Sequence, residues 1–251
     1  MAEFTNKKSL GQNFLKDENV AVQMVDSLKI NDADHVIEVG GGLGFVTKYL
    51  VKEPNLSKLD VYEIDERAVN MLNERFGRCR GVKILKENIL DARICEDFDA
   101  SYKVIGAIPY YITSPIIHHL LNVRNRPTKI VLLIQKEVAD KLISKVPRAN
   151  YWSYITAGYN VLKVMDVSAE LFDPAPKVDS SVLLFEKTEN LTENIPFRKW
   201  SGFLHKAYKN PRKMLNKAFD KELLKSVGIN PQDRPQNVNL EEWIKLYKKA
   251  L

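Results

Sequence analysis

The chain has 251 residues, of which 45% are hydrophobic and 28% charged, a composition of globular proteins that excludes disordered and fibrous classes. At about 150 residues per domain, the length predicts one large domain or a large domain with a small companion. Cys79 and Cys95 are too few and too far apart for a disulfide framework or a zinc site. The longest aliphatic run, residues 130–134, is too short to span a bilayer, and residues 1–15 lack the apolar core of a secretory signal. We therefore expect a cytoplasmic protein without a metal or a membrane.

Short β-branched runs alternate with segments of helical periodicity through most of the chain. Strands are predicted at residues 35–39, 59–64, 82–85, 102–105, 129–134 and 181–185. Helices between them are indicated by the apolar spacings Ala21, Met24, Val25, Leu28 and Ala68, Leu72, Phe76. Several strands are apolar on both faces, which favours a mostly parallel sheet covered by helices on each side. These patterns predict an α/β domain over residues 1–186.

The last part of the chain, residues 187–251, has helical patterns and turn signals but no convincing strand. Asn239 and Glu242 have the spacing of a capping box at the start of its final helix. One apolar face of that helix is formed by Leu240, Trp243, Ile244, Tyr247 and Leu251. A small all-helical domain is therefore predicted after the first domain.

A glycine-rich turn joins the first predicted strand to a helical pattern over residues 46–51. Gly40, Gly42 and Gly44 lie in this turn, where glycine lets the backbone approach a ligand closely. Glu63 ends the second strand, and a carboxylate at that place can accept hydrogen bonds from both hydroxyls of a ribose. A glycine turn alone would be an ordinary connection, but together with the acid it predicts a nucleoside cofactor.

Two more side chains bear on which nucleoside is bound. The loop reads GGGLG and not GxGxxG, and Glu38 precedes it on the strand. An acid there repels a pyrophosphate but can hold the ammonium of an amino-acid moiety, directly or through water. Asn88 ends the third strand, where its oxygen can accept from an adenine amine. These residues favour S-adenosylmethionine over a dinucleotide, and a nicotinamide dehydrogenase is the weaker alternative.

Eight segments together resemble the ribosomal RNA adenine dimethyltransferases of the small subunit. They are KKSLGQNFL at 7–15, EVGGGLG at 38–44, EID at 63–65, IPYYITSP at 108–115, QKEVAD at 135–140, FDPAPKVDSS at 172–181, NPRKMLN at 210–216 and RPQNVNL at 234–240. The resemblance implies a class I methyltransferase: a Rossmann-like, mostly parallel sheet of seven strands with a small C-terminal helical domain, and S-adenosylmethionine as donor. It also implies dimethylation of exocyclic N6 on two adjacent adenosines of small-subunit ribosomal RNA, coupled to assembly of the immature small subunit, by a monomer.

The resemblance assigns residues to both ends of the site. The cofactor residues it implies are Gln12, Asn13, Leu15, Glu38, Gly40, Gly42, Gly44, Glu63, Ile64, Asn88, Ile89 and Ala107. An adenine amine is a poor nucleophile because its lone pair is delocalised, so both N–H hydrogens must be accepted while the nitrogen is held in line. In the family an Asn side chain accepts one hydrogen and the next carbonyl accepts the other. Here that carbonyl belongs to Ile108, held by Pro109; Tyr110 stacks on the extruded base and Phe172 closes the pocket.

The chain departs from the family pattern at the critical position, where Ala107 replaces the motif Asn. Loss of one preorganised group typically costs about 2.7–4 kcal/mol of transition-state stabilisation. We therefore expect a slow or inactive form, either an engineered Asn→Ala variant or a natural member kept for binding. The alternatives are an Erm-type methyltransferase of large-subunit RNA and a non-catalytic RNA-binding or ribosome-assembly factor. A milder departure is Asn88, where relatives usually carry Asp.

The positive charge is concentrated in one segment. Residues 198–225 contain nine basic and two acidic residues, a net +7, so the remainder of the chain carries −1 of the total +6. The spacing 206, 209, 213, 217 predicts one helix face that tracks phosphates without reading sequence. The alternative is a helix whose basic face is only solvated and whose aromatic residues belong to the core. The RNA-binding residues predicted from the charge and the resemblance are Lys7, Lys8, Lys206, Lys209, Arg212, Lys213 and Lys217.

Overall fold

The computed structural model describes residues 11–32, 34–92, 101–188 and 195–250. Contacts divide the chain into two compact units. The first unit is formed by Met1–Ala139 with Leu162–Glu186, and the second by Asp140–Val161 with Lys187–Leu251. This division differs from the predicted boundary between residues 186 and 187, because Asp140–Val161 group with the second unit.

Long-range contacts explain why Asp140–Val161 join the second unit. The indole Nε1 of Trp200 donates to the carbonyl of Tyr154 at 2.9 Å. The Tyr151 hydroxyl lies 2.7 Å from Ser201 Oγ. These partners are 46 and 50 residues apart in sequence, so local periodicity could not assign this segment.

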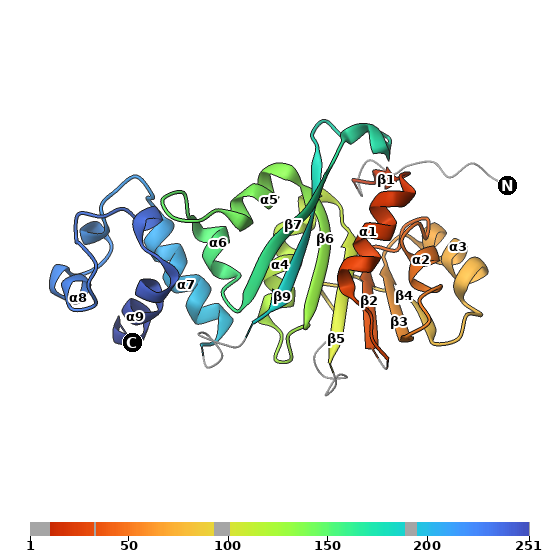
Figure 1. The fold of residues 1–251 in the computed structure, drawn as a ribbon, viewed down its shortest axis with the longest axis horizontal. Coiled ribbons are helices and arrows are strands. Elements are labelled where there is room, and N and C mark those ends of the chain that lie inside the picture. The colour runs from red at the N-terminus through yellow and green to blue at the C-terminus, as the bar shows by residue number, and fades with distance from the viewer. Residues whose placement is uncertain (1–10, 33, 93–100, 189–194, 251) are drawn as a thin grey trace. The chain divides into compact units, whose positions relative to one another are not determined.

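The first unit is built on a seven-stranded sheet with the order β4-β3-β2-β5-β6-β9-β7 (Figure 1). Its strands are β2 (Asp34–Val39), β3 (Leu56–Glu63), β4 (Val82–Lys86), β5 (Tyr102–Ala107), β6 (Lys129–Gln135), β7 (Tyr159–Val167) and β9 (Ser180–Lys187). β2 pairs in parallel with β3 and β5, β3 with β4, and β5 with β6, whereas β6 and β9 are antiparallel. The predicted mostly parallel sheet of seven strands is thus confirmed.

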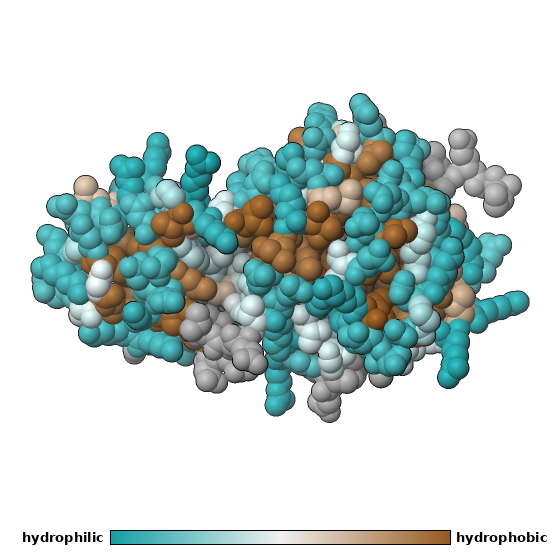
Figure 2. All heavy atoms as spheres, in the orientation of Figure 1, coloured by the Kyte–Doolittle hydropathy of each residue, from teal (hydrophilic) through white to brown (hydrophobic). Residues whose placement is uncertain are grey.

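Six of the seven strands coincide with the runs predicted from the sequence. The seventh, β7, was not located, because Lys163 and Asp166 interrupt its apolar pattern. β7 lies last in the strand order, and its residues alternate irregularly between buried and exposed. Figure 2 shows apolar groups beside polar ones across this face of the molecule. An edge strand of this kind carries charges that discourage pairing with another chain, and that composition hides its periodicity.

Helices cover both faces of the sheet. The helices of the first unit are α1 (Glu18–Leu28), α2 (Thr47–Leu50), α3 (Glu66–Phe76) and α4 (Thr113–Asn122), and α5 (Lys136–Ile143) crosses into the second unit. Figure 1 shows α1 in front of the sheet and α4 behind it. All residues of β2 are buried between these layers, which explains why its sequence is not a polar–apolar alternation. α1 and α3 are capped by the preceding Asp17 and Asp65, whose side chains accept from backbone N–H groups of the first turn.

The strand order places a binding crevice at the carboxyl ends of the parallel strands. From β2 the chain moves outward to β3 and β4, and then returns to the other side of β2 as β5. Such a reversal opens a crevice at the carboxyl ends of the strands, where open parallel sheets bind ligands. The short strands β1 (Phe14–Leu15) and β8 (Phe172–Asp173) form a separate antiparallel pair that also reaches this crevice.

The second unit is mainly helical around an aromatic core. Its helices are α6 (Tyr151–Ile155), α7 (Phe197–Tyr208), α8 (Lys221–Lys225) and α9 (Leu240–Ala250). Trp243 is fully buried and meets the Phe203 ring edge to face. Phe203 in turn stacks on Trp200 and meets Tyr247 edge to face. Asn239 N donates to Glu242 Oε2 at 2.8 Å and Glu242 N donates to Asn239 Oδ1 at 3.0 Å. The predicted capping box at the start of α9 is therefore confirmed.

Candidate active site

A cavity of about 450 Å³ lies at the carboxyl ends of the parallel strands. Its volume falls in the range of small-molecule sites. The predicted cofactor residues that line it are Gln12, Asn13, Leu15, Glu38, Gly40, Gly42, Glu63, Ile64, Asn88, Ile89 and Ala107. All five predicted base-site residues line the same cavity: Ala107, Ile108, Pro109, Tyr110 and Phe172. One continuous cavity therefore contains both ends of the predicted site.

The glycine loop after β2 forms one wall of the cavity. Gly40 and Gly42 have φ of 75° and 52°, a conformation that favours glycine. A Cβ on Gly42 would lie 3.3 Å from the Phe14 ring, so a side chain there would crowd the space between the loop and β1. The absence of side chains at Gly40 and Gly42 keeps this wall open to a ligand.

Gly44 is the one predicted cofactor residue that does not line the cavity. Its φ is 76°, and a Cβ would lie 2.5 Å from Phe76 Cε2 and 3.1 Å from Leu72 Cδ2. Gly44 therefore packs the loop closely against α3, and its contact with the cofactor stays a prediction. The sequence could not separate the two roles, because both require a glycine in the same turn.

Replacing Gly44 by Ala is expected to lower stability more than cofactor affinity. Overpacking of this kind costs about 1–3 kcal/mol, which thermal unfolding would register as a fall of several degrees. The matched variant Gly42→Ala is expected to weaken cofactor binding more, since its added methyl group faces Phe14 at the cavity. Equal losses of cofactor affinity in the two variants would contradict this division of roles.

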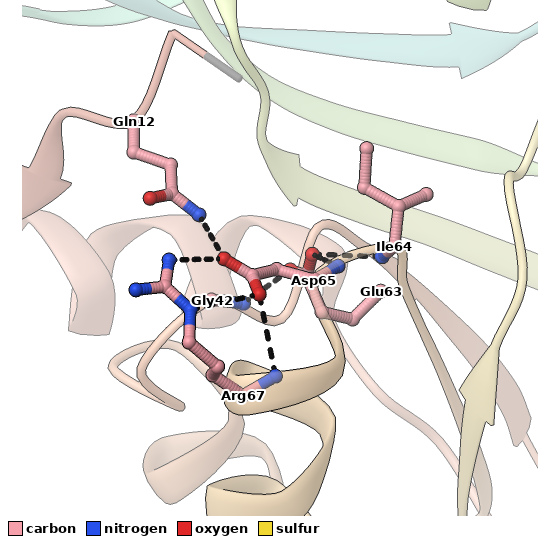
Figure 3. Close-up of polar contacts among 6 residues, drawn as sticks. All are labelled: Gln12, Gly42, Glu63, Ile64, Asp65 and Arg67. Atoms are coloured by element: carbon pink, nitrogen blue, oxygen red, sulfur yellow. Dashed lines mark hydrogen bonds and ion pairs between the residues drawn. The ribbon is translucent and has the colours of Figure 1, made fainter. Parts of the chain in front are cut away.

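Glu63, at the end of β3, is held by three backbone N–H groups (Figure 3). Its Oε2 accepts from Gly42 N at 2.8 Å, and its Oε1 accepts from Ile64 N at 2.7 Å and from Asp65 N at 2.8 Å. A carboxylate has about four acceptor sites, so acceptor capacity remains for one ligand hydroxyl without displacing an N–H group. The predicted acceptance of both ribose hydroxyls requires a change at one of these bonds.

Asp65 ties the N-terminal segment to the ribose side of the site. Its Oδ2 accepts from Gln12 Nε2 at 2.9 Å, and its carboxylate also accepts from Arg67 Nε and Nη2 at 3.1 and 2.6 Å. In Figure 3, Gln12 reaches down from the N-terminal segment while Arg67 reaches from α3, so both meet the same carboxylate. Gln12 was predicted as a cofactor residue; it lines the cavity and also anchors this segment over it.

Glu38 is a buried carboxyl group in the wall of the cavity. Its side chain is only 2% exposed, and its Oε2 accepts from Thr47 Oγ1 at 2.7 Å. Burial and the nearby charge of Glu63 together raise its pKa to about 8, against the opposing effect of the Thr47 bond. A cationic group bound beside Glu38 would favour the ionised carboxylate, because an opposite charge favours ionisation.

The base end of the cavity is formed where β5 ends. Ala107 is the last residue of β5 and pairs with Leu133 of β6. The Tyr110 hydroxyl lies 2.7 Å from the Oγ of Ser180, which is fully buried. Burial raises the pKa of this phenol. Phe172, buried in β8, faces the same cavity. None of Ala107, Ile108 and Pro109 has a side-chain acceptor, and the Tyr110 hydroxyl is engaged by Ser180.

Asn88, predicted to accept from an adenine amine, closes a turn after β4. Its Oδ1 accepts from Leu90 N at 3.1 Å. An amide oxygen has a second lone pair, so Asn88 Oδ1 can accept a hydrogen bond from an adenine amine as well. An Asp in its place would add a second oxygen.

The basic residues of the second unit do not lie on one helix face, which corrects the prediction. α7 ends at Tyr208, and Asn210 and Pro211 follow; proline lacks the N–H group and cannot continue a helix. Lys206, Lys209, Lys213 and Lys217 nevertheless line one cavity of about 310 Å³. Arg212 is exposed but does not line it. The turn thus gathers the four lysines that a continuous helix would have aligned.

Several lining residues were missed by the sequence argument. They include Phe14, Phe45, Tyr62, Ile112, Leu133 and Asp173. Phe14 and Asp173 pair across β1 and β8, a contact that no spacing in the sequence indicated. Lys7 and Lys8, predicted to bind RNA, lie outside the described residues.

Comparison with known proteins identifies the family. The model of the ribosomal RNA adenine dimethylase family matches residues 3–250. The chain belongs to this family. It is therefore a methyltransferase that uses S-adenosylmethionine to dimethylate adenine in ribosomal RNA, as the resemblance implied.

Two similar curated proteins share the name ribosomal RNA small subunit methyltransferase A. The one from Malacoplasma penetrans (strain HF-2) is 33% identical, covering 97% of this chain and 92% of that protein. The one from Mycoplasma mobile (strain ATCC 43663 / 163K / NCTC 11711) is 34% identical, covering 94% and 95%. The alignments run through both units of the chain.

Solved structures agree with the fold. A dimethyladenosine transferase from Plasmodium falciparum matches with a TM-score of 0.82 at 22% identity, covering 95% of this chain and 98% of that one. The 23S ribosomal RNA methyltransferase ErmE matches with a TM-score of 0.75 at 23% identity, covering 94% and 99%. The class I methyltransferase fold is thus confirmed.

The residues at the cavity fit S-adenosylmethionine. An ammonium beside the buried Glu38 would stabilise its carboxylate form. The backbone of Gly40 to Gly42 has no side chains that would block the cofactor, and Glu63 can accept a further hydrogen bond from a hydroxyl. Within the described ranges, no group of three or more His, Cys, Asp or Glu side chains is placed to hold a metal ion. None of the helices in those ranges is both long and apolar enough to cross a membrane.

Proposed function

We propose that this enzyme dimethylates the exocyclic N6 of two adjacent adenosines in small-subunit ribosomal RNA, on the immature small subunit, as a cytoplasmic monomer. The observation that carries the proposal is the single cavity that joins Glu38 and Glu63 to the Ile108–Tyr110 turn and Phe172. The names of the similar proteins support the small subunit as the substrate.

The side chains divide the work between the two ends of the cavity. S-adenosylmethionine supplies an electrophilic methyl group on a sulfonium. Glu38 pairs with the ammonium of its amino-acid moiety, and Glu63 accepts from its ribose. At the other end, the Ile108 carbonyl accepts one N–H of the target amine, while Tyr110 and Phe172 hold the adenine ring. The hydrogen bond to Ser180 fixes the position of the Tyr110 hydroxyl at the far end of the ring.

Ala107 leaves the second N–H of the amine without the acceptor that the family motif supplies. We infer that the enzyme is slow for this reason, since positioning and binding remain while one preorganised bond is missing. The same observation favours a second candidate function, a binding factor in assembly of the small subunit. Methylation that stays below detection with intact RNA binding would support this second function.

Transfer of a labelled methyl group tests the choice of substrate. Immature small subunits and large-subunit RNA would be incubated separately with the protein and labelled S-adenosylmethionine. We expect label in small-subunit RNA only. Label confined to large-subunit RNA would overturn the proposal in favour of an Erm-type activity.

We also propose that the cavity lined by Lys206, Lys209, Lys213 and Lys217 binds RNA phosphates. The four lysines line one cavity, and phosphate contacts of this type position RNA without reading its sequence. Each neutralised phosphate of a single strand adds about 0.7 to the slope of log affinity against log salt.

Charge reversal at Lys209 and Lys213 is expected to weaken RNA binding at least about tenfold and to lower the salt slope by about 1.4, since two phosphate contacts are lost. The matched control reverses the exposed Lys245 and Lys248 of α9, which changes net charge equally in the same unit. Affinity would be measured by fluorescence anisotropy over a salt series. Equal losses in both double variants would show that only net charge matters.

A further inference from the structure

Tyr111 follows Tyr110 beside the base end of the cavity. Its side chain is 57% exposed, which is unusual for so large a ring. It does not line the cavity, although its chain neighbours Tyr110 and Ile112 both do. Because these residues form the short helix η2 (Tyr110–Ile112), with about three residues per turn, successive side chains point in directions that differ by about 120°. Tyr110 therefore faces the cavity while Tyr111 stands at its rim.

The ring of Tyr111 is supported from one side. Gly11 lines the cavity with φ of 59°, and a Cβ there would lie 3.1 Å from both Cδ1 and Cε1 of Tyr111. The backbone of the N-terminal segment thus lies directly against the ring. Gln12, the next residue, is fixed to Asp65. A ring backed in this way is already restricted. It therefore loses less rotamer entropy when it binds a ligand than a mobile side chain would.

We propose that Tyr111 is a substrate-binding residue that stacks on the nucleotide next to the target adenosine. The inference rests on the proposed function and deepens it. When one base leaves the stack and enters the cavity, the base beside it loses a stacking partner. An aromatic ring replaces that partner without regard to base identity, because every base has a π-face. Consecutive tyrosines of η2 then serve consecutive nucleotides, Tyr110 the base inside and Tyr111 the base outside.

Loss of one base–aromatic contact weakens binding by roughly 5- to 150-fold. Tyr111→Ala is therefore expected to raise the dissociation constant for small-subunit RNA by a factor in this range. Tyr111→Phe, which keeps the ring, is expected to bind like the wild type. The control is Leu162→Ala in β7, another exposed apolar residue of the first unit that does not line the cavity. Cofactor affinity should stay unchanged in all three variants.

An abasic nucleotide separates stacking from a structural role. The wild type and Tyr111→Ala would be measured by anisotropy on intact RNA and on RNA that is abasic on one or the other side of the target adenosine. We expect one of the abasic RNAs to weaken wild-type binding and to abolish the difference between the two proteins. The same loss on every RNA, or no loss on intact RNA, would overturn the proposal. Because this readout is binding, it is independent of methyl transfer: absence of label in small-subunit RNA would overturn the proposed function alone.

Discussion

Ala107→Asn is expected to raise the rate of methyl transfer roughly a hundred- to a thousand-fold. The change restores the side-chain acceptor for the second N–H of the target amine, and one preorganised bond of this kind is worth about 2.7–4 kcal/mol in the transition state. Ala107 lines the cavity at the end of β5, so the larger side chain enters open space. The measurement is the single-turnover rate with saturating S-adenosylmethionine and immature small subunits.

Two comparisons make the Ala107→Asn result specific. Ala107→Leu adds a side chain of similar length without an acceptor, and we expect it to give no gain in rate. The cofactor dissociation constant should change far less than the rate in Ala107→Asn, because the restored acceptor acts on the adenine amine. Equal rates in the wild type and Ala107→Asn, or an equal gain in Ala107→Leu, would contradict the account of the missing acceptor.

The second large effect is a pH dependence of cofactor binding that originates at Glu38. With a pKa of about 8, the buried carboxyl is mostly protonated at pH 7 in the free protein. Pairing with an ammonium requires the charged form, so binding releases a proton from Glu38. Between pH 6 and 7.5, cofactor affinity is therefore expected to rise up to about tenfold per pH unit, since each unit of pH changes the free energy by about 1.36 kcal/mol.

Calorimetry at pH 7 in two buffers of different ionisation enthalpy would count the protons released. We expect close to one proton for the wild type and close to none for Glu38→Gln, whose affinity should be lower and nearly independent of pH. Release of no proton by the wild type would show that Glu38 does not meet the ammonium.

Glu38 also makes the free energy of unfolding depend on pH. The folded-state pKa of Glu38 lies above the ordinary 4.5, so the folded protein binds more protons than the unfolded chain between pH 4.5 and 8. The contribution of Glu38 to the free energy of unfolding therefore falls as pH rises through this window, by an amount of the order of a few kcal/mol. Glu38→Gln should remove this fall in urea titrations at pH 6 and pH 8.5.

Local patterns were enough to predict most of the fold. The β-branched runs at residues 35–39 and 129–134 are strands, and Glu63 stands at the end of its strand as the spacing indicated. Asn239 and Glu242 cap α9. Each of these features depends on neighbours in the sequence, through periodicity or through a hydrogen bond three residues away.

Features that depend on distant contacts escaped prediction. Gly44 packs against Phe76 of α3, which only the packed structure shows. The role of Gln12 as an anchor required Asp65, 53 residues away. The state of Glu38 follows from its burial, and burial cannot be read from a residue name. The lysine spacing predicted one continuous helix face, but α7 ends at Tyr208, before Pro211.

The identity of the methylated nucleoside tests the central claim most directly. Small-subunit RNA would be incubated with Ala107→Asn protein and S-adenosylmethionine, digested to nucleosides and separated by liquid chromatography with mass detection. The account predicts N6,N6-dimethyladenosine, with the monomethylated form as its precursor, and the same products more slowly from the wild type. Methylation of adenine at a ring position, methylation of another base, or no methylated nucleoside from either protein would contradict it.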